Sequence, residues 1–139
     1  MPLKLTLKPF EKALVGTAVI ANGGSKTEIV VMNTVPVLRE RDIITEEEAT
    51  TPARRIYFTI LNMYADPKNE AAYHEMYFSL IREFIDASRN AKVLDMVADI
   101  SQKILCGTHY QALKECRKLI DYEAEVLGRA GLDRADGAT

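Results

Sequence analysis

Hydrophobic residues alternate with polar ones in the first part of the chain and recur every three to four residues in the rest. In residues 3–7, leucines alternate with Lys4 and Thr6, which is the period-two pattern of a half-buried strand. A second β-type run covers residues 13–20, where Gly16 favours a bulge or a sharp bend. Further along, the period becomes that of amphipathic helices. The pattern therefore predicts an α+β protein.

The β-type runs of the first part are connected by residues that suit turns. Residues 22–25 read NGGS and tolerate positive φ, and a run rich in Val and Ile follows at 27–32. This combination predicts a hairpin between the second and third runs. We expect residues 1–44 to form a small antiparallel β unit.

A charged connector, residues 37–58 (VLRERDIITEEEATTPARRIYF), joins the two parts. Its first two residues predict one more extended piece, with Arg39 and Arg41 on one side of the extended chain and Glu40 on the other. The four residues that follow the pattern of helix starts are Thr45 and Glu48, which fit a capping box, and Thr51 and Pro52, which fit a cap and a first helical position. We expect these four to form the structural joint.

The second part predicts four mainly antiparallel helices within residues 45–127, followed by a flexible tail at 128–139. We expect helices at about 52–65, 68–88 and 91–105, and a last one ending near 127. Their inward faces comprise Ile56, Phe58, Ile60, Leu61, Met63, Tyr64, Tyr73, Tyr77, Leu80, Ile81, Phe84, Ile85, Val93, Leu94, Val97, Ile100, Ile104, Leu105, Ala112, Leu113, Cys116, Leu119 and Ile120.

Composition places the chain among ordinary globular proteins, with 139 residues, 47% hydrophobic and 27% charged. It has no apolar run near the roughly 20 residues of a membrane-spanning helix, and its start lacks the pattern of a signal peptide. We therefore expect a cytoplasmic protein without membrane partners. In that compartment Cys106 and Cys116 are most simply buried thiols.

The sequence contains no motif of catalytic chemistry: no serine elbow, no cysteine beside a histidine, no Walker loop and no dinucleotide fingerprint. His74 and His109 stand isolated, without the spacing of known metal sites. We therefore expect no enzyme, no catalytic residue, no cofactor and no metal.

Net charge is −2, yet it is unevenly distributed. Residues 1–42 hold six basic and four acidic residues, and the remainder holds twelve and sixteen. The first part is therefore the one that an anion would prefer.

Three stretches of the connector carry a resemblance to a known family: residues 36–43 (PVLRERDI), 47–49 (EEA) and 51–58 (TPARRIYF). Together with Lys4-Leu5, the MYxDP pattern at 63–67 and Ala112-Leu113-Lys114, they resemble the FlbT family of flagellar regulators over residues 3 to about 125. One departure is Phe10, since we expect a glycine after Pro9 in relatives.

The resemblance implies a cytoplasmic post-transcriptional regulator that acts on flagellin messenger RNA through its 5′ untranslated region. Such a regulator usually represses translation and promotes decay of the message, although activation also occurs in the family. The resemblance also implies a shared circuit with FlaF, a small flagellin-associated partner. It leaves homo-oligomerisation open.

RNA binding by this chain would be local, through the cations of the β unit and the connector. The RNA-binding candidates are Lys4, Lys8, Arg39, Arg41, Arg54 and Arg55. The acids of the connector, including the glutamates at 46–48, are expected to neutralise its arginines in the absence of RNA. The alternative is an adaptor that binds flagellin or the FlaF-type partner through a helical groove and affects the message only indirectly. The acidic helical part and the lack of a known RNA-binding module favour that alternative.

Overall fold

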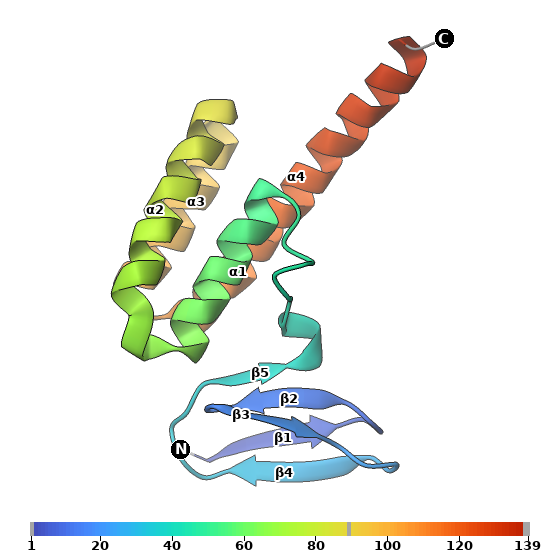
Figure 1. The fold of residues 1–139 in the computed structure, drawn as a ribbon, viewed down its shortest axis with the longest axis vertical. Helices are drawn as coiled ribbons and strands as arrows, with labels where there is room; N and C mark the ends of the chain where they lie inside the picture. Colours follow the sequence, from blue (N-terminus) through green and yellow to red (C-terminus); the bar gives the residue numbers. More distant parts are fainter. Residues whose placement is uncertain (1, 89, 138–139) are drawn as a thin grey trace.

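A computed structural model describes residues 2–88 and 90–137, with side chains described up to residue 127. Figure 1 shows a β unit at one end of the molecule and a bundle of helices above it. The described residues form the predicted α+β arrangement of antiparallel strands followed by four α-helices. The last helix, α4 (His109–Gly137), extends well beyond the other three.

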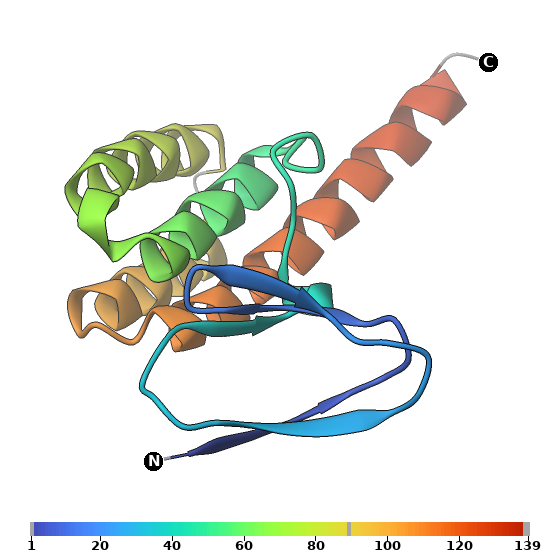
Figure 2. The ribbon, with the colours of Figure 1, turned by 60° about the horizontal axis from the view of Figure 1, so that its bottom comes forward.

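The strands form two small antiparallel sheets. β1 (Leu3–Leu7) pairs with β4 (Thr27–Val31), while β2 (Lys12–Val15) lies between β3 (Ala18–Ala21) and β5 (Val37–Arg39). Leu5, Leu7 and Ala13 form a small core, against which Ile20, Ile29 and Val37 pack. Because every strand contributes to this core, the two sheets pack together as one unit (Figure 2).

The hairpin predicted at residues 22–25 is wrong. β3 and β4 are consecutive in the chain but lie in different sheets, because β4 pairs with β1 and brings Ile29 opposite Leu5 of the small core. Instead, the second run folds back on itself as β2 and β3, with Gly16 at φ 63° in the two-residue turn. The side-chain amide of Asn22 holds the β3–β4 loop by donating to the carbonyls of Leu7, Lys8 and Ser25 at 2.8–3.2 Å.

The connector departs from an extended chain earlier than expected. β5 ends at Arg39, and the next three residues form the short 3₁₀ helix η1 (Glu40–Asp42). Arg39 and Arg41 therefore do not alternate with Glu40 along one strand. Leu38 of β5 is fully buried in the helical core, so this strand fixes the β unit to the helices.

Thr45 and Glu48 form the hydrogen bonds of a capping box, and Thr51 caps the next helix. Thr45 N donates to Glu48 Oε1 at 3.0 Å and Glu48 N donates to Thr45 Oγ1 at 3.3 Å, which is the reciprocal pair of a capping box. The box closes a turn and not a helix. α1 (Pro52–Ala65) starts with Pro52 after its N-cap Thr51, as predicted.

The remaining helices are α2 (Glu70–Ala87), which follows the short η2 (Pro67–Asn69), and α3 (Ala91–Leu105). α1 packs against α2 and α4, and α3 packs against α4. The helical core contains the expected residues with three exceptions. Leu94 and Leu105, predicted to face inward, are 48% and 75% exposed, and Phe58 is only half-buried and lies outside the core. Both leucines belong to α3 but lie outside the helical core.

Two further expectations need correction: that both cysteines are buried, which holds only for Cys116, and that the last helix ends near residue 127. Cys116 is buried beneath α1, with its thiol near the carbonyl of Ala53, and burial raises the pKa of that thiol. Cys106 is exposed where α3 ends and is not a buried thiol. The helix expected to end near 127 continues to Gly137, so the backbone of the predicted tail is helical up to that residue. The side chains of that tail lie outside the described part, and its flexibility stays a prediction.

Candidate nucleic-acid interface

A basic groove opens on the β unit where the β1–β2 loop meets β5 and η1. Its volume is about 670 Å³. It is lined by four cations, two acids and three uncharged residues: Lys8, Lys26, Arg39, Arg41, Glu11, Glu40, Thr6, Pro9 and Phe10. We refer to these residues as the basic groove.

The two acids of the basic groove are occupied by backbone donors. Glu11 Oε1 accepts from Lys8 N at 2.8 Å, and Glu40 Oε2 accepts from Lys12 N at 3.3 Å. Neither carboxylate forms an ion pair with a lysine or arginine within the described residues. The four cations and two acids leave the groove with a net positive charge, and its lysine and arginine side chains remain available to an anion.

The cations of the basic groove differ in how firmly they are held. The Arg39 guanidinium donates to the carbonyl of Thr6 at 2.9 Å, which fixes its position across β1. Lys8, Lys26 and Arg41 are exposed, and none of the three side chains forms an ion pair in the part of the chain that the structure describes. This combination suits contacts with phosphates spaced along a flexible strand.

Phe10 lies in the basic groove with 72% of its surface exposed. Its φ is 62°, in the left-handed region that strongly favours glycine. Its amide donates to the carbonyl of Gly23 at 2.9 Å, and its ring lies against the backbone of Gly24. Phe10 thus places an exposed aromatic ring beside four cations.

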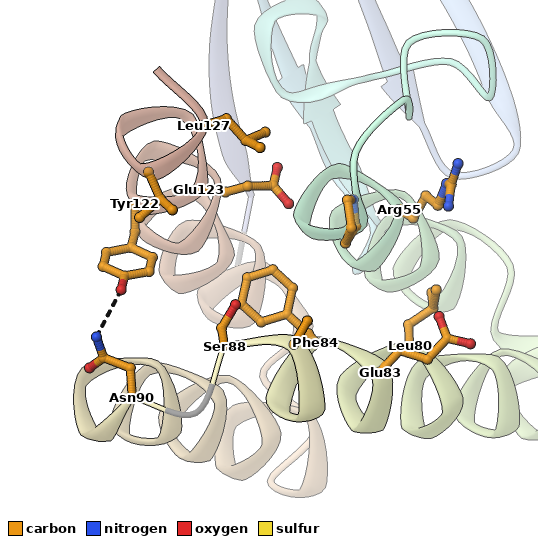
Figure 3. Close-up of a pocket in the computed structure, with 12 residues that line it drawn as sticks. Arg55, Leu80, Glu83, Phe84, Ser88, Asn90, Tyr122, Glu123 and Leu127 are labelled. Atoms are coloured by element: carbon orange, nitrogen blue, oxygen red, sulfur yellow. Dashed lines mark hydrogen bonds between the residues drawn. The ribbon is translucent and has the colours of Figure 1, made fainter. Parts of the chain in front are cut away.

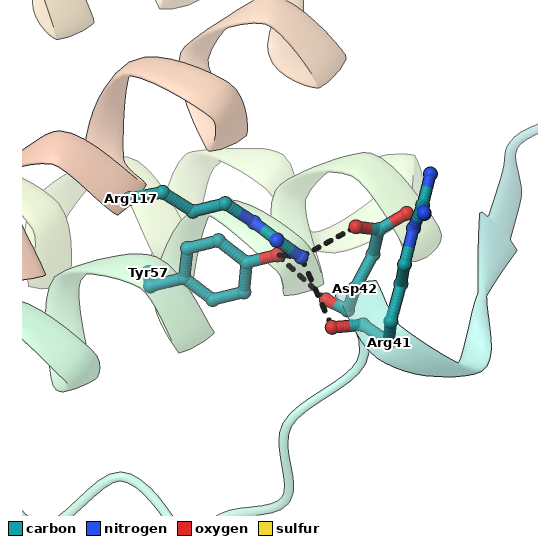
Figure 4. A network of polar contacts seen from close by, with 4 residues as sticks. All are labelled: Arg41, Asp42, Tyr57 and Arg117. Atoms are coloured by element: carbon teal, nitrogen blue, oxygen red, sulfur yellow. Dashed lines mark hydrogen bonds and ion pairs between the residues drawn. The ribbon is translucent and has the colours of Figure 1, made fainter.

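An ion pair connects the rim of the basic groove to the helices (Figure 4). Arg117 of α4 donates to the Asp42 carboxylate and, at 3.0 Å, to the carbonyl of Arg41. Tyr57 of α1 donates to the carbonyl of Asp42 at 2.7 Å. η1 is therefore attached to two helices, while the side chain of Arg41 forms no ion pair within the described residues.

The surroundings of Arg117 and Tyr57 raise the pKa values of both groups. The hydrogen bond with Tyr57 raises the pKa of Arg117, and the nearby Asp42 carboxylate adds to that effect. Burial raises the pKa of Tyr57. Arg117 is therefore a permanent cation and Tyr57 a neutral donor at neutral pH. The sequence could not reveal this pair, because 75 residues separate its members.

Replacing Arg117 by alanine is expected to destabilise the fold by about 1.5 kcal/mol, because Asp42 is only 8% exposed and would lose its charged partner. The guanidinium is itself 44% exposed, so solvent screening limits the loss. The melting temperature should fall by about 6 °C. Arg82→Ala is the matched control, since this exposed arginine of α2 has no ion pair among the described residues. Equal melting temperatures of the two variants would contradict this role.

The structure brings together three of the six RNA-binding candidates, Lys8, Arg39 and Arg41, in the basic groove. Arg54 lies close by, since it shares a smaller hollow with Arg41 on the helical side. Lys4 is paired with Glu28 at 3.4 Å and lies outside the basic groove.

The sixth candidate, Arg55, lies elsewhere, beside an apolar groove of the helical bundle (Figure 3). The sequence reasoning missed Lys26 and Phe10. For Phe10 the sequence offered one signal, an aromatic residue where a glycine was expected. That its ring is exposed in the groove could be seen only in the structure.

The expected neutralisation of the connector's arginines by its acids is wrong. Asp42 pairs with Arg117 of α4, and Glu48 is used in the capping box. Within the described residues, the glutamates at 46–48 form no ion pair with any arginine. The connector instead leaves Arg41 and Arg54 open.

No described helix combines the length and apolarity needed to cross a membrane. No solved structure matches the chain.

Comparison with known proteins gives consistent matches along nearly the whole chain. A protein of Caulobacter sp., named a probable flagellum biosynthesis repressor protein FlbT, is 45% identical to this chain over 92% of this chain and 98% of its own length. The flagellum biosynthesis repressor protein FlbT of Caulobacter vibrioides is 42% identical over 92% and 91%, and a probable one of Rhodopseudomonas palustris is 40% identical over 93% and 100%. The profile of a family described as flagellar protein FlbT matches residues 3–127. The chain therefore belongs to the FlbT family of flagellar proteins.

Proposed function

We propose that this chain is a repressor of flagellum biosynthesis that binds the 5′ untranslated region of flagellin messenger RNA through the basic groove. The names of its relatives supply the repressor role. The observation that supports RNA contact is the groove itself, with four cations and an exposed aromatic ring. Cations hold the phosphates of a single strand, and an aromatic face stacks on an unpaired base.

In this function the chain acts in the cytoplasm without catalysis. Bound to the leader, it blocks translation and exposes the message to decay. A single-stranded or loop segment is the expected target, because the groove lies between loops and a strand edge and has no helix that could enter a duplex groove.

The experiment that tests this proposal is direct binding of the purified chain to a flagellin leader RNA across a range of salt concentrations. If four cations contact phosphates, log K should fall with log salt at a slope of about −3, and affinity should drop about 50-fold between 50 and 200 mM. An unrelated leader of equal length and base composition is the control. Absence of binding at 50 mM salt would contradict direct RNA recognition.

A second candidate function is the adaptor, and a second groove favours it. The apolar groove, with a volume of about 510 Å³, lies between the start of α1, the end of α2 and α4. Leu80, Phe84, Val126 and Leu127 line it, and the last two are 41% and 52% exposed. Such a surface suits an amphipathic helix of flagellin or of a FlaF-type protein.

Co-purification from RNase-treated cells discriminates the two candidates. If the adaptor function holds, flagellin or its small partner should remain bound after RNase, and Leu127→Asp, which changes an exposed residue of the groove, should release it. If RNA binding holds, the leader should be enriched with the untreated chain whether or not Leu127 is replaced.

A further inference from the structure

The two histidines that look isolated in the sequence lie together in the structure. Glu70 and His74 occupy successive turns of α2, and His109 is the first residue of α4. Glu70 Oε1 lies 3.2 Å from His74 Nε2 and 3.1 Å from His109 Nε2. One atom from each of the three residues lies within 4.8 Å of the other two.

The orientation of His109 does not suit a hydrogen bond to this carboxylate. Its Nε2 is buried and has no hydrogen-bond partner, although Glu70 Oε1 is only 3.1 Å away. A buried polar nitrogen without a partner costs free energy, so such groups are rare in native proteins. His74 Nε2 and Glu70 Oε1 share a hydrogen bond at 3.2 Å, so His109 Nε2 is the atom of the cluster that is left without a partner. A cation bound by all three side chains would satisfy it. Tetrahedral zinc with bonds of 2.0–2.1 Å places its ligand atoms about 3.3 Å apart.

We propose that Glu70, His74 and His109 form a binding site for a divalent transition metal, with Zn²⁺ as the expected ion. Two imidazoles and one carboxylate are ligands that Zn²⁺ accepts, and they leave a fourth position to water. Glu70 and His74 are four residues apart on one helix face, so α2 presents both ligands to the same point. The rings of His74 and Phe78 lie in a T-shaped arrangement, with centroids 6.4 Å apart.

The site would connect α2 directly to α4, two helices that otherwise pack mainly against α1 and α3 and not against each other. α2 packs on α1, and α4 packs on α1 and α3, so a bond between α2 and His109 adds a direct link across the bundle. The three side chains are 14–40% exposed, which lets an ion enter from solvent. Metal binding should therefore stabilise the bundle without a large rearrangement.

The test uses the full chain without an affinity tag, stripped of metal with EDTA. Titration with Zn²⁺ by calorimetry should give one equivalent per chain, and Co²⁺ should produce the visible bands of tetrahedral coordination. His74→Ala and His109→Ala should each weaken Zn²⁺ binding at least about 100-fold, and Glu70→Gln about 10-fold. Zn²⁺ at 100 times its dissociation constant should raise the melting temperature of the unsubstituted chain by about 8 °C.

Cys106→Ser is the matched control, because it removes an exposed thiol from the α3–α4 connection but not from the cluster. Its Zn²⁺ affinity should equal that of the unsubstituted chain. The unsubstituted chain decides the question even if a histidine variant fails to fold: no binding of Zn²⁺ or Co²⁺ at 100 times the protein concentration overturns the site. Binding that persists unchanged in folded His74→Ala and His109→Ala chains overturns it as well.

Discussion

The double substitution R39A/R41A is expected to weaken binding to the flagellin leader about 50-fold at 50 mM salt and about 10-fold at 200 mM. Counterion release from single-stranded nucleic acid contributes about 0.7 to the salt slope for each phosphate contact, so two lost contacts change the slope from about −2.8 to about −1.4. Arg39 and Arg41 lie in the same groove, and Arg41 has no acidic partner among the described residues. Binding assays at four salt concentrations measure both quantities.

R55A/R82A is the matched control for this variant. It removes the same charge from exposed arginines of α1 and α2, and neither of them lines the basic groove. Its affinity should stay within about twofold of the unsubstituted chain, because long-range charge effects are largely screened at these salt concentrations. Equal losses in both double variants would mean that net charge, and not the groove, holds the RNA.

The stability of R39A/R41A has to be measured alongside its affinity. Arg39 donates to Thr6 across the β unit, so its loss is expected to cost about 1 kcal/mol of folding free energy. Arg41→Ala alone should leave stability unchanged, because only its backbone carbonyl takes part in the Arg117 network. The single variant therefore separates RNA contact from folding.

The helices were predictable because each one has a continuous apolar face. α1 and α3 have the expected bounds, and Pro52 and Asn90 mark their starts by chemistry that acts within one turn. Exposed Leu94 and Leu105 show the limit of such patterns, since periodicity indicates a face but not how wide the neighbouring helix is.

The strand partners could not be predicted in the same way. A period of two tells which side of a strand is buried and does not name the neighbouring strand. Residues 22–25 have the composition of a hairpin, yet burial of Ile29 beside Leu5 selects β1 as the partner of β4. The pairs Asp42 with Arg117 and His74 with His109 are tertiary contacts that no local spacing encodes.

Three of the four cations that line the basic groove could be predicted from the sequence. Charge in the β unit and the connector pointed to Lys8, Arg39 and Arg41, because a cation needs no special geometry to attract an anion. The acids looked like partners of those arginines in sequence, but Asp42 is turned toward α4 by η1. Local opposite charge is therefore a poor guide to which cations are free.

Replacing Phe10 by glycine is expected to weaken RNA binding while it stabilises the fold. Stacking of one base on an aromatic side chain contributes about 1–3 kcal/mol, so affinity should fall by at least about fivefold. The same change removes a side chain from φ 62° and relieves about 1 kcal/mol of backbone strain. Because the ring is 72% exposed, little apolar burial is lost in exchange.

Because stability is expected to rise while RNA affinity falls, this substitution separates the two properties, which a variant that loses both would not do. Urea unfolding should show a higher midpoint for Phe10→Gly, and the RNA assay a lower affinity with an unchanged salt slope, since no phosphate contact is removed. Phe10→Tyr is the matched control, because it keeps an aromatic face and the strained φ and should retain both affinity and stability. A glycine variant that binds RNA as tightly as the unsubstituted chain would exclude Phe10 from the interface and leave the cations alone to hold the message.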